Sequence, residues 1–372
     1  MKVVIIGAGA AGLSIGWRLR QAGAVVTILD RGEPGRGATW AAAGMLSIVG
    51  QDEHSTRAET AFALWSHRLW PGFAAQIEQQ TGQSLGYRRD GKLVVARTEQ
   101  EFAALSRRCA LKRDMSPRSA AEACALEPML RDDVAGAFWD DTEAQVDNRA
   151  LGPALLQAFL RIGGRMCDNE MVVGIESDKS HVTGVRTHST VHRGDVCVLA
   201  AGAWSSRIEG LPPSLDGVVI PIKGEMIAFS GGEVPKRIVW GNGVYLVPRR
   251  NRLLVGATSS DDGFDTEPTE SARDWLASSA RDLMPDLCNW ELVEHWAGLR
   301  PGSQDGLPVL GRTELDGLIV ASGQYRNGIL FAPAIAEAVR TLVCNQPSPV
   351  DISSFNPARF PKVTLADTDT VG

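Results

Sequence analysis

The chain has 372 residues, of which 44% are hydrophobic and 22% charged, and its formal net charge is −6. A chain of this length favours two structural units and can bury a core that needs no disulfide or metal staple. The acidic balance and the scattered basic pairs argue against a nucleic-acid partner.

Six cysteines and six histidines are dispersed, without the close spacing of a metal site or a disulfide framework. We therefore expect no metal, and reduced cysteines in a cytoplasmic protein. Glycine interrupts the apolar run 1–13, which also lacks a small-residue cleavage site, so it does not resemble a signal peptide. No apolar stretch approaches the length of a membrane span.

The first thirty residues predict a βαβ unit. Segments 2–6 and 25–29 are β-branched strands, and 13–22 reads as the helix between them. G-A-G-A-A-G at 7–12 fits the G-x-G-x-x-G pattern, in which successive glycines permit a tight turn, approach of a pyrophosphate, and close helix packing. Asp30 ends the second strand, where a carboxylate binds ribose hydroxyls. The unit predicts a Rossmann-type dinucleotide site with phosphates at the helix N-terminus.

The remaining chain alternates helical and strand-like segments. Helices are expected at 58–81, 99–115, 119–126, 148–161, 269–283 and 329–343. Strands are expected at 172–175, 181–187, 195–199, 218–229, 244–248, 252–257 and 318–321. Segment 85–95 reads as a hairpin that turns at Asp90-Gly91. The Pro-containing tail from Asn345 reads as loosely attached.

The βαβ unit alone does not separate FAD from NAD. The small-residue segment 37–45 and a late S-G-x-x-x-N-G-I at the start of a helix suit a longer flavin that lies across the domain. The helix could direct its N-terminal N–H groups at the flavin and stabilise negative charge on its reduced form.

Nucleotide-binding features recur near positions 200 and 325, with strand-rich segments between them. This order predicts an α/β fold (α+β overall), in which a Rossmann-type FAD-binding domain carries an inserted antiparallel-sheet substrate domain. The FAD-binding domain is expected to comprise 1–84, 145–215 and 298–345. The substrate domain is expected to comprise 85–144 and 216–297, and 346–372 forms a C-terminal tail.

Four segments resemble the D-amino-acid oxidase superfamily, and within it the glycine oxidases linked to thiamine (thiazole) biosynthesis. They are D-R-G-E-P-G-R-G-A-T-W-A-A-A-G-M-L (30–46), V-L-A-A-G-A-W-S (198–205), G-L-R-P-G-S-Q-D-G-L-P-V-L-G (298–311) and G-Q-Y-R-N-G-I-L-F-A-P-A (323–334). The resemblance implies non-covalent FAD and hydride transfer to flavin N5 from glycine, sarcosine or a short D-amino acid. The implied products are a 2-oxo acid, ammonia or an amine, and hydrogen peroxide, with oxygen as acceptor. It also implies a homo-oligomer.

The same resemblance and the dinucleotide pattern together nominate the cofactor-binding residues. Asp30 stands where flavin enzymes often carry glutamate, and Gln324 stands where histidine or another polar residue is expected. Val172 is expected to contact adenine through its backbone, and residues 324–330 to wrap the isoalloxazine end. The nominated set is Gly7, Gly9, Ala10, Ala11, Gly12, Asp30, Arg31, Ala38, Thr39, Ala43, Gly44, Met45, Val172, Ala201, Gly202, Trp204, Gln324, Tyr325, Arg326, Asn327, Gly328, Ile329 and Leu330.

Three residues are candidates for binding and orienting the substrate. Arg300, in a G-L-R-P turn, could clamp a carboxylate through two parallel hydrogen bonds, or it could be a surface or structural arginine. Tyr245 could donate its hydroxyl to the same carboxylate, or pack as a core tyrosine. Arg326 could hold the substrate or balance charge on reduced flavin, or it could be structural. No general base is assigned, since hydride transfer from a neutral amine needs none.

Two other functions remain open at this stage. The first is a dehydrogenase of the same fold that passes electrons to a quinone or a partner protein. The second is a flavin-binding subunit without amine chemistry, which would have no use for a carboxylate clamp.

Overall fold

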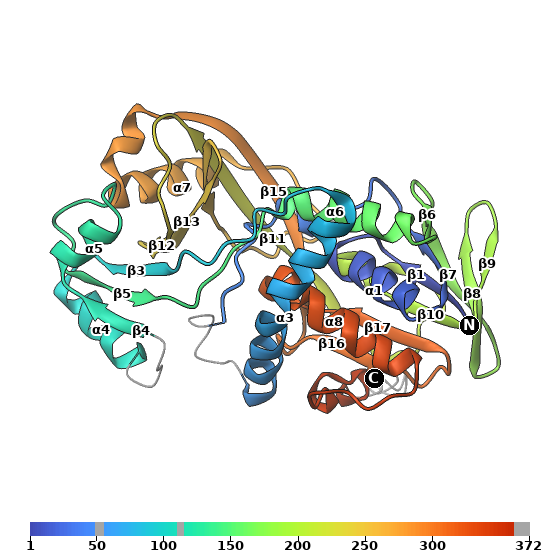
Figure 1. The fold of residues 1–372 in the computed structure, drawn as a ribbon. Coiled ribbons are helices and arrows are strands. Elements are labelled where there is room, and N and C mark those ends of the chain that lie inside the picture. Colours follow the sequence, from blue (N-terminus) through green and yellow to red (C-terminus); the bar gives the residue numbers. More distant parts are fainter. Residues whose placement is uncertain (49–55, 110–114, 361–372) are drawn as a thin grey trace, which may run out of the picture.

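The computed structural model describes residues 1–48, 56–109 and 115–360. A six-stranded sheet at the right of Figure 1 has the order β16-β17-β10-β1-β2-β6. Strand β1 runs parallel to both of its neighbours, and only the edge strand β16 is antiparallel. The sheet comprises β1 (Lys2–Ile6), β2 (Val25–Leu29), β6 (Arg165–Cys167), β10 (Val196–Leu199), β16 (Val309–Arg312) and β17 (Leu318–Ser322).

Alternate residues of these strands enter two different cores. Val3 and Ile5 of β1 pack with four helices, which are α1 (Ala10–Gln21), α3 (Arg57–Thr81), α6 (Asn148–Arg161) and α8 (Gly328–Val343). Val4 and Ile6 face a three-stranded sheet made of β7 (Val172–Asp178), β8 (His181–Thr187) and β9 (Val191–Arg193). Such alternation is typical of a strand buried on both faces. The parallel sheet is therefore the middle of three layers, with helices on one face and the three-stranded sheet on the other.

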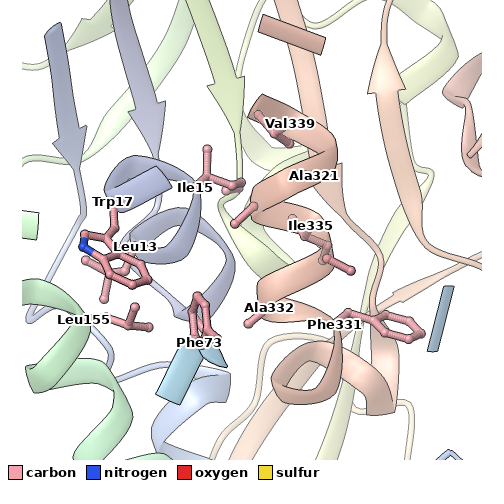
Figure 2. Close-up of a cluster of buried hydrophobic side chains, with 14 of the residues drawn as sticks. Leu13, Ile15, Trp17, Phe73, Leu155, Ala321, Phe331, Ala332, Ile335 and Val339 are labelled. Carbon is pink, nitrogen blue, oxygen red and sulfur yellow. The ribbon is translucent and has the colours of Figure 1, made fainter. Parts of the chain in front are cut away.

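The helical side of this sandwich is a continuous apolar core. Figure 2 shows Trp17 of α1 and Phe73 of α3 close together, with Phe331 and Ile335 projecting from α8. The rings of Trp17 and Phe73 meet edge to face, with centroids 5.4 Å apart. This packing fixes the N-termini of α1 and α8 relative to the parallel sheet.

An eight-stranded sheet forms the other half of the molecule, at the left of Figure 1. Its pairs are antiparallel except for the parallel pair β12–β3. Helices α4 (Glu99–Cys109), α5 (Ala120–Leu126) and α7 (Glu270–Leu283) pack on it. The strands are β3 (Lys92–Ala96), β4 (Met115–Arg118), β5 (Gly136–Asp140), β11 (Val219–Ser230), β12 (Ile238–Gly241), β13 (Val244–Arg249), β14 (Arg252–Gly256) and β15 (Glu291–Ser303). The expected fold class is confirmed.

Short helices complete the chain. They are α2 (Ala38–Ala41) and the 3₁₀ turns η1 (Gly202–Arg207), η2 (Pro213–Leu215), η3 (Pro285–Asn289), η4 (Tyr325–Asn327), η5 (Ser353–Phe355) and η6 (Pro357–Arg359).

The expected hairpin at Asp90-Gly91 is wrong. Strand β3 begins only at Lys92, and it pairs with β5 and β12 instead of with the residues before it. The preceding segment bonds to a distant partner, because Arg88 exchanges backbone hydrogen bonds of 3.0 and 2.9 Å with Gln145. A D-G pair predicts a turn from local preference alone, and long-range pairing decides otherwise here.

Three other expectations also need correction. The helix expected at 99–115 ends at Cys109, residues 110–114 lie outside the described part, and Met115 begins β4. Arg300 lies inside β15, a 13-residue strand, and not in a turn. The tail is not loosely attached over its described part, because the Phe355 side chain is 0% exposed and contacts the Phe62 ring at 5.3 Å.

Candidate active site

A cavity of about 1090 Å³ lies between the parallel sheet and the eight-stranded sheet. On one side it is lined by the carboxyl end of β1, the segment 37–45, and residues at the start of η1. On the other side it is lined by residues of β11, β12, β13 and β15, and the loop before α8 closes it. The carboxyl ends of parallel strands are where open α/β sheets bind ligands.

The glycines of the first turn have separate tasks. Gly7 has φ +104°, and a Cβ there would lie 2.3 Å from the carbonyl oxygen of Ala200. A Cβ on Gly12 would lie 1.9 Å from the carbonyl oxygen of Gly7, so this glycine permits close packing of helix on strand. At Gly9 the nearest atom would be Oγ1 of Thr39 at 3.4 Å, which leaves its surface open to the cavity.

The N-terminus of α1 has the partial positive charge and terminal amide groups that favour binding of an anion. Its N-cap is Gly9, its first turn carries no acidic residue, and Thr39 Oγ1 accepts a 2.8 Å hydrogen bond from the Ala10 amide. The helix dipole and the terminal N–H groups there favour phosphate.

Asp30 and Arg31 mark the nucleoside end of the cavity. The Asp30 carboxylate accepts hydrogen bonds from the amides of Ala8 at 2.6 Å and Gly32 at 3.0 Å. Burial raises the pKa of Asp30, although these amides oppose the shift. The Arg31 guanidinium lies 3.4 Å from the centroid of the Trp204 ring. Val172 lines the same end.

The segment 43–45 is held rigidly against the cavity. Gly44 has φ +74°, and a Cβ there would lie 2.0 Å from the Val146 carbonyl oxygen. Arg249 donates to that oxygen at 2.8 Å and also to the carbonyl of Ala43. Burial lowers the pKa of Arg249 to about 10.

Apolar side chains form the walls of the cavity opposite this segment. Trp240 Nε1 lies 3.4 Å from the Met45 sulfur, and the Trp240 and Tyr245 ring centroids are 5.9 Å apart. The Tyr245 hydroxyl lies 3.8 Å from the Met226 sulfur. Burial raises the pKa of Tyr245 against the opposing effect of Arg300, so this phenol is a neutral donor near pH 7.

Arg300 of β15 is held by the neighbouring strand β11 and by the segment that follows β14. In the β11–β15 register it faces Ile222, and its guanidinium lies over Gly224, where a Cβ would be 2.1 Å from Nη1. Nη1 donates to the carbonyls of Thr258 at 3.1 Å and Lys223 at 3.3 Å. The Tyr245 hydroxyl interacts with the same guanidinium, and Nη2 has no hydrogen bond to a carbonyl of the described residues, so Arg300 and Tyr245 can face a ligand in the cavity together.

The loop before α8 adds further polar groups. The Arg326 guanidinium lies 5.0 Å from the Tyr325 ring centroid, and the Tyr325 hydroxyl is 3.4 Å from the Ser259 hydroxyl. Burial would raise the pKa of Tyr325, but Ser259 and the Arg326 and Arg300 guanidinium groups outweigh it, and the pKa lies below its usual range. Gln324 is 5% exposed, and its Nε2 finds no partner in the described chain.

The structure brings most of the nominated residues to this one cavity. Three do not line it: Gly12 packs beneath Gly7, Asn327 donates to Glu59 at 3.0 Å, and the Leu330 carbonyl accepts from Trp70 at 2.9 Å. The Asn327 side chain and the Leu330 carbonyl thus bond to α3, and the contact of 324–330 with a cofactor stays a prediction. The lining set is Gly7, Gly9, Ala10, Ala11, Asp30, Arg31, Ala38, Thr39, Ala43, Gly44, Met45, Val172, Ala201, Gly202, Trp204, Tyr245, Arg300, Gln324, Tyr325, Arg326, Gly328 and Ile329.

Sequence reasoning missed part of the substrate-side lining. Met226, Trp240 and Thr258 line the cavity but belong to no recognisable motif. Their positions follow from the strand order of the eight-stranded sheet, which no local pattern reveals.

These features fit FAD. The open Gly9 surface and a helix N-terminus whose N-cap residue has no side chain suit a pyrophosphate, and Asp30 can accept from ribose hydroxyls. The buried, unpartnered Gln324 amide is a donor that an elongated polar ligand would satisfy. A cavity of about 1090 Å³ exceeds what a small amino acid needs alone.

The described residues include no helix long and apolar enough to cross a membrane.

The proteins that this chain resembles are FAD-dependent enzymes, as the cavity lining suggests. Residues 2–342 match the family described as DAO, FAD dependent oxidoreductase. The chain is 35% identical to glycine oxidases from Pseudomonas aeruginosa and Geobacillus kaustophilus, covering 96% of this chain and 98% and 96% of theirs. The crystal structure of the Geobacillus kaustophilus enzyme superposes with a TM-score of 0.89 at 33% identity, over 96% of this chain and 98% of that one.

A longer relative extends beyond the region shared with this chain. The bifunctional protein ThiO/ThiG of Trichormus variabilis is 35% identical over 97% of this chain, which spans 55% of that protein. Because the family match covers nearly the whole chain, this protein belongs to the DAO family of FAD-dependent oxidoreductases.

Proposed function

We propose that the protein oxidises glycine or another small amino acid at the carbon between its amine and its carboxylate. The observation that carries this proposal is the placement of the Arg300 guanidinium and the Tyr245 hydroxyl in one cavity with the segment 43–45. Relatives named glycine oxidase, which align over nearly the full chain, support it.

Arg300 and Tyr245 suit a carboxylate. A guanidinium whose Nη1 is fixed by the Thr258 carbonyl can offer its other edge to a carboxylate without reorganising. The raised pKa of Tyr245 keeps its hydroxyl protonated, so that it donates to the same anion. Together they would orient the substrate, which is most of the protein's task when a cofactor carries the chemistry.

The same residues favour a neutral amine. FAD, when bound, would supply the acceptor for one hydride, which carries both electrons. Arg300 and Arg326 both contribute positive charge at this end of the cavity, and the walls are apolar at Met45 and Met226. Positive neighbours and desolvation both lower the pKa of an ammonium group. The site therefore favours the amine form that carries the lone pair, without a dedicated base.

The electron acceptor, the assembly and the compartment are also part of this proposal. We infer that oxygen takes the electrons and gives hydrogen peroxide, and that the protein is a cytoplasmic homo-oligomer. The residue-level assignments of FAD and substrate contacts, and the domain boundaries given above, belong to the same proposal. A non-catalytic flavin-binding subunit is less consistent with the paired Arg300 and Tyr245.

The test compares glycine, sarcosine and D-alanine with ethylamine, which lacks the carboxylate, in air-saturated buffer. Oxygen consumption and peroxide are measured together. We expect turnover of at least one amino acid, peroxide equal to the oxygen consumed, and no turnover of ethylamine. Equal turnover of ethylamine and glycine would contradict a carboxylate clamp. Turnover with a quinone dye but not with oxygen would instead identify a dehydrogenase.

A further inference from the structure

A buried charge cluster lies behind the substrate side of the cavity. Lys92, the first residue of β3, is 0% exposed, and its Nζ donates to Glu143 Oε2 at 2.6 Å and Ser47 Oγ at 2.7 Å. Asp140 Oδ2 is 3.9 Å from the same nitrogen. None of these side chains lines the cavity. No sequence motif marks them, and the proposed reaction does not use them.

A contribution to folding stability does not by itself explain why these charges are buried together. Removing two charges from water costs about as much as their mutual attraction returns, and a well-packed apolar pair is often at least as stable. Burial raises the pKa of Glu143, which shows that its ionised form is held at a cost despite the adjacent Lys92. The position of the cluster suggests another role.

Lys92 contacts the back of a cavity wall. Its Nζ is 5.0 Å from the centroid of the Trp240 ring, within range of a cation–π interaction. Trp240 lies on β12, which runs parallel to β3, with Trp240 opposite Val94. The Trp240 ring lines the cavity beside Tyr245 and Met45. The Lys92 ammonium group therefore contacts the Trp240 ring without lining the cavity itself.

The same ammonium group also holds the segment that carries Met45. Its partner Ser47 is two residues beyond Met45, and Leu46 between them donates from its amide to the Ala144 carbonyl at 2.9 Å. Lys92 thus joins the segment that contains Met45 to the strand that contains Trp240. These are the two sides of the Trp240–Met45 contact.

We propose that Lys92, with Glu143, is a positioning residue that acts through Trp240 to set the width of the substrate pocket. This inference rests on the proposed function and adds a determinant of substrate size to it. Without the Lys92 ammonium, the ring loses its fixed position, and the pocket admits a larger amine relative to glycine. A desolvated cation–π contact corresponds to a change of about tenfold or more in that ratio.

The test is a double-mutant cycle on the FAD-loaded protein. Lys92→Met/Glu143→Gln removes the ammonium and its nearest carboxylate together, while Asp140 keeps its hydrogen bonds from Thr142. Trp240→Leu removes the ring. For each variant and the triple variant, kcat and KM are measured for glycine and N-ethylglycine. Glu127→Gln is the matched control, because Glu127 is also buried and accepts an amide hydrogen bond at 2.9 Å, but lies outside the cavity lining.

We expect the neutral pair to raise the ratio of kcat/KM for N-ethylglycine over glycine about tenfold, mainly through KM. In the Trp240→Leu background the same change should alter the ratio less than about twofold. Glu127→Gln should leave the ratio unchanged, and FAD affinity should be unaffected by the neutral pair. An unchanged ratio, or an equal change with and without Trp240, would overturn the proposal.

Two further measurements keep the test decisive. If the double variant does not fold, Lys92→Gln replaces it, since its amide can still donate to Ser47 without the charge. If the wild-type protein oxidises none of glycine, sarcosine, D-alanine and N-ethylglycine, the proposed function fails, and the cycle is run on affinity for acetate against butyrate, read from the flavin absorbance. The neutral pair should then favour butyrate only when Trp240 is present, and the absence of this dependence would overturn the inference by itself.

Discussion

Gly224 is the position where the smallest change should disable the carboxylate clamp. A Cβ there would lie 2.1 Å from Nη1, 2.2 Å from Nη2 and 2.3 Å from Cζ of Arg300, whereas ordinary contact begins at 3.4 Å. Gly224→Ala must therefore displace the whole guanidinium by about one ångström. A displacement of that size in an orienting group costs about 100-fold in rate, or about 2.7 kcal/mol.

The fold should tolerate this change, because the displaced atoms are the far end of a flexible side chain. Steady-state kinetics with the best amino acid should show kcat/KM lowered about 100-fold, with FAD affinity retained. Adding Gly224→Ala to Arg300→Lys should have little further effect, since both remove the same fork geometry. Gly72→Ala is the control, because a Cβ on this helical glycine meets nothing within 4 Å. A Gly224→Ala variant within about twofold of wild type would refute the assigned role of Arg300.

Three further outcomes are expected. Gly9→Ala should leave the melting temperature of the FAD-free protein unchanged, since the added Cβ meets only Thr39 Oγ1 at 3.4 Å. The same methyl group should obstruct the pyrophosphate and weaken FAD binding, and an unchanged FAD affinity in a titration would contradict this. Among the three tyrosines, the pKa of Tyr325 is lowered and those of Tyr87 and Tyr245 are raised. Ultraviolet titration of the FAD-free protein should therefore show one phenol ionising below pH 10 and two above it, and Tyr325→Phe should remove the early phase. Because the folded pKa of Tyr325 lies below its unfolded value, its ionisation should stabilise the fold as pH rises through that range. Phe355→Ala should destabilise the protein by about 3–5 kcal/mol in denaturant unfolding, since its ring is fully buried against Phe62; a loss under about 1 kcal/mol would mean that the tail does not pack.

The parts of the fold that sequence predicts are those set by local pattern. The βαβ unit was predictable because β-branched runs, spaced glycines and a terminal acid agree over thirty consecutive residues. Strand β15 was not, because its glycines and Pro301 argue against a strand, and only pairing with β11 along its length stabilises it.

The site residues likewise divide into those that a sequence motif predicts and those that only strand pairing places. Motifs nominate the glycines, Asp30 and Arg300, because their chemistry is tied to residue type. Trp240 and Lys92 carry no such mark, since their roles follow from β12 lying beside β3 across nearly 150 residues of chain. A motif gives neighbouring positions but not the direction of each side chain, and the hydrogen bond from Asn327 to Glu59 could not be predicted from it.

The most direct measurement of the central claim is the visible spectrum of the purified, FAD-loaded protein during anaerobic addition of glycine, sarcosine and D-alanine. We expect the flavin absorbance to bleach with at least one of them, and to return with formation of peroxide when air is admitted. Arg300→Lys should bleach at least about tenfold more slowly at the same amino-acid concentration. A protein that binds FAD but is bleached by none of these amino acids would contradict amino-acid oxidation at this site.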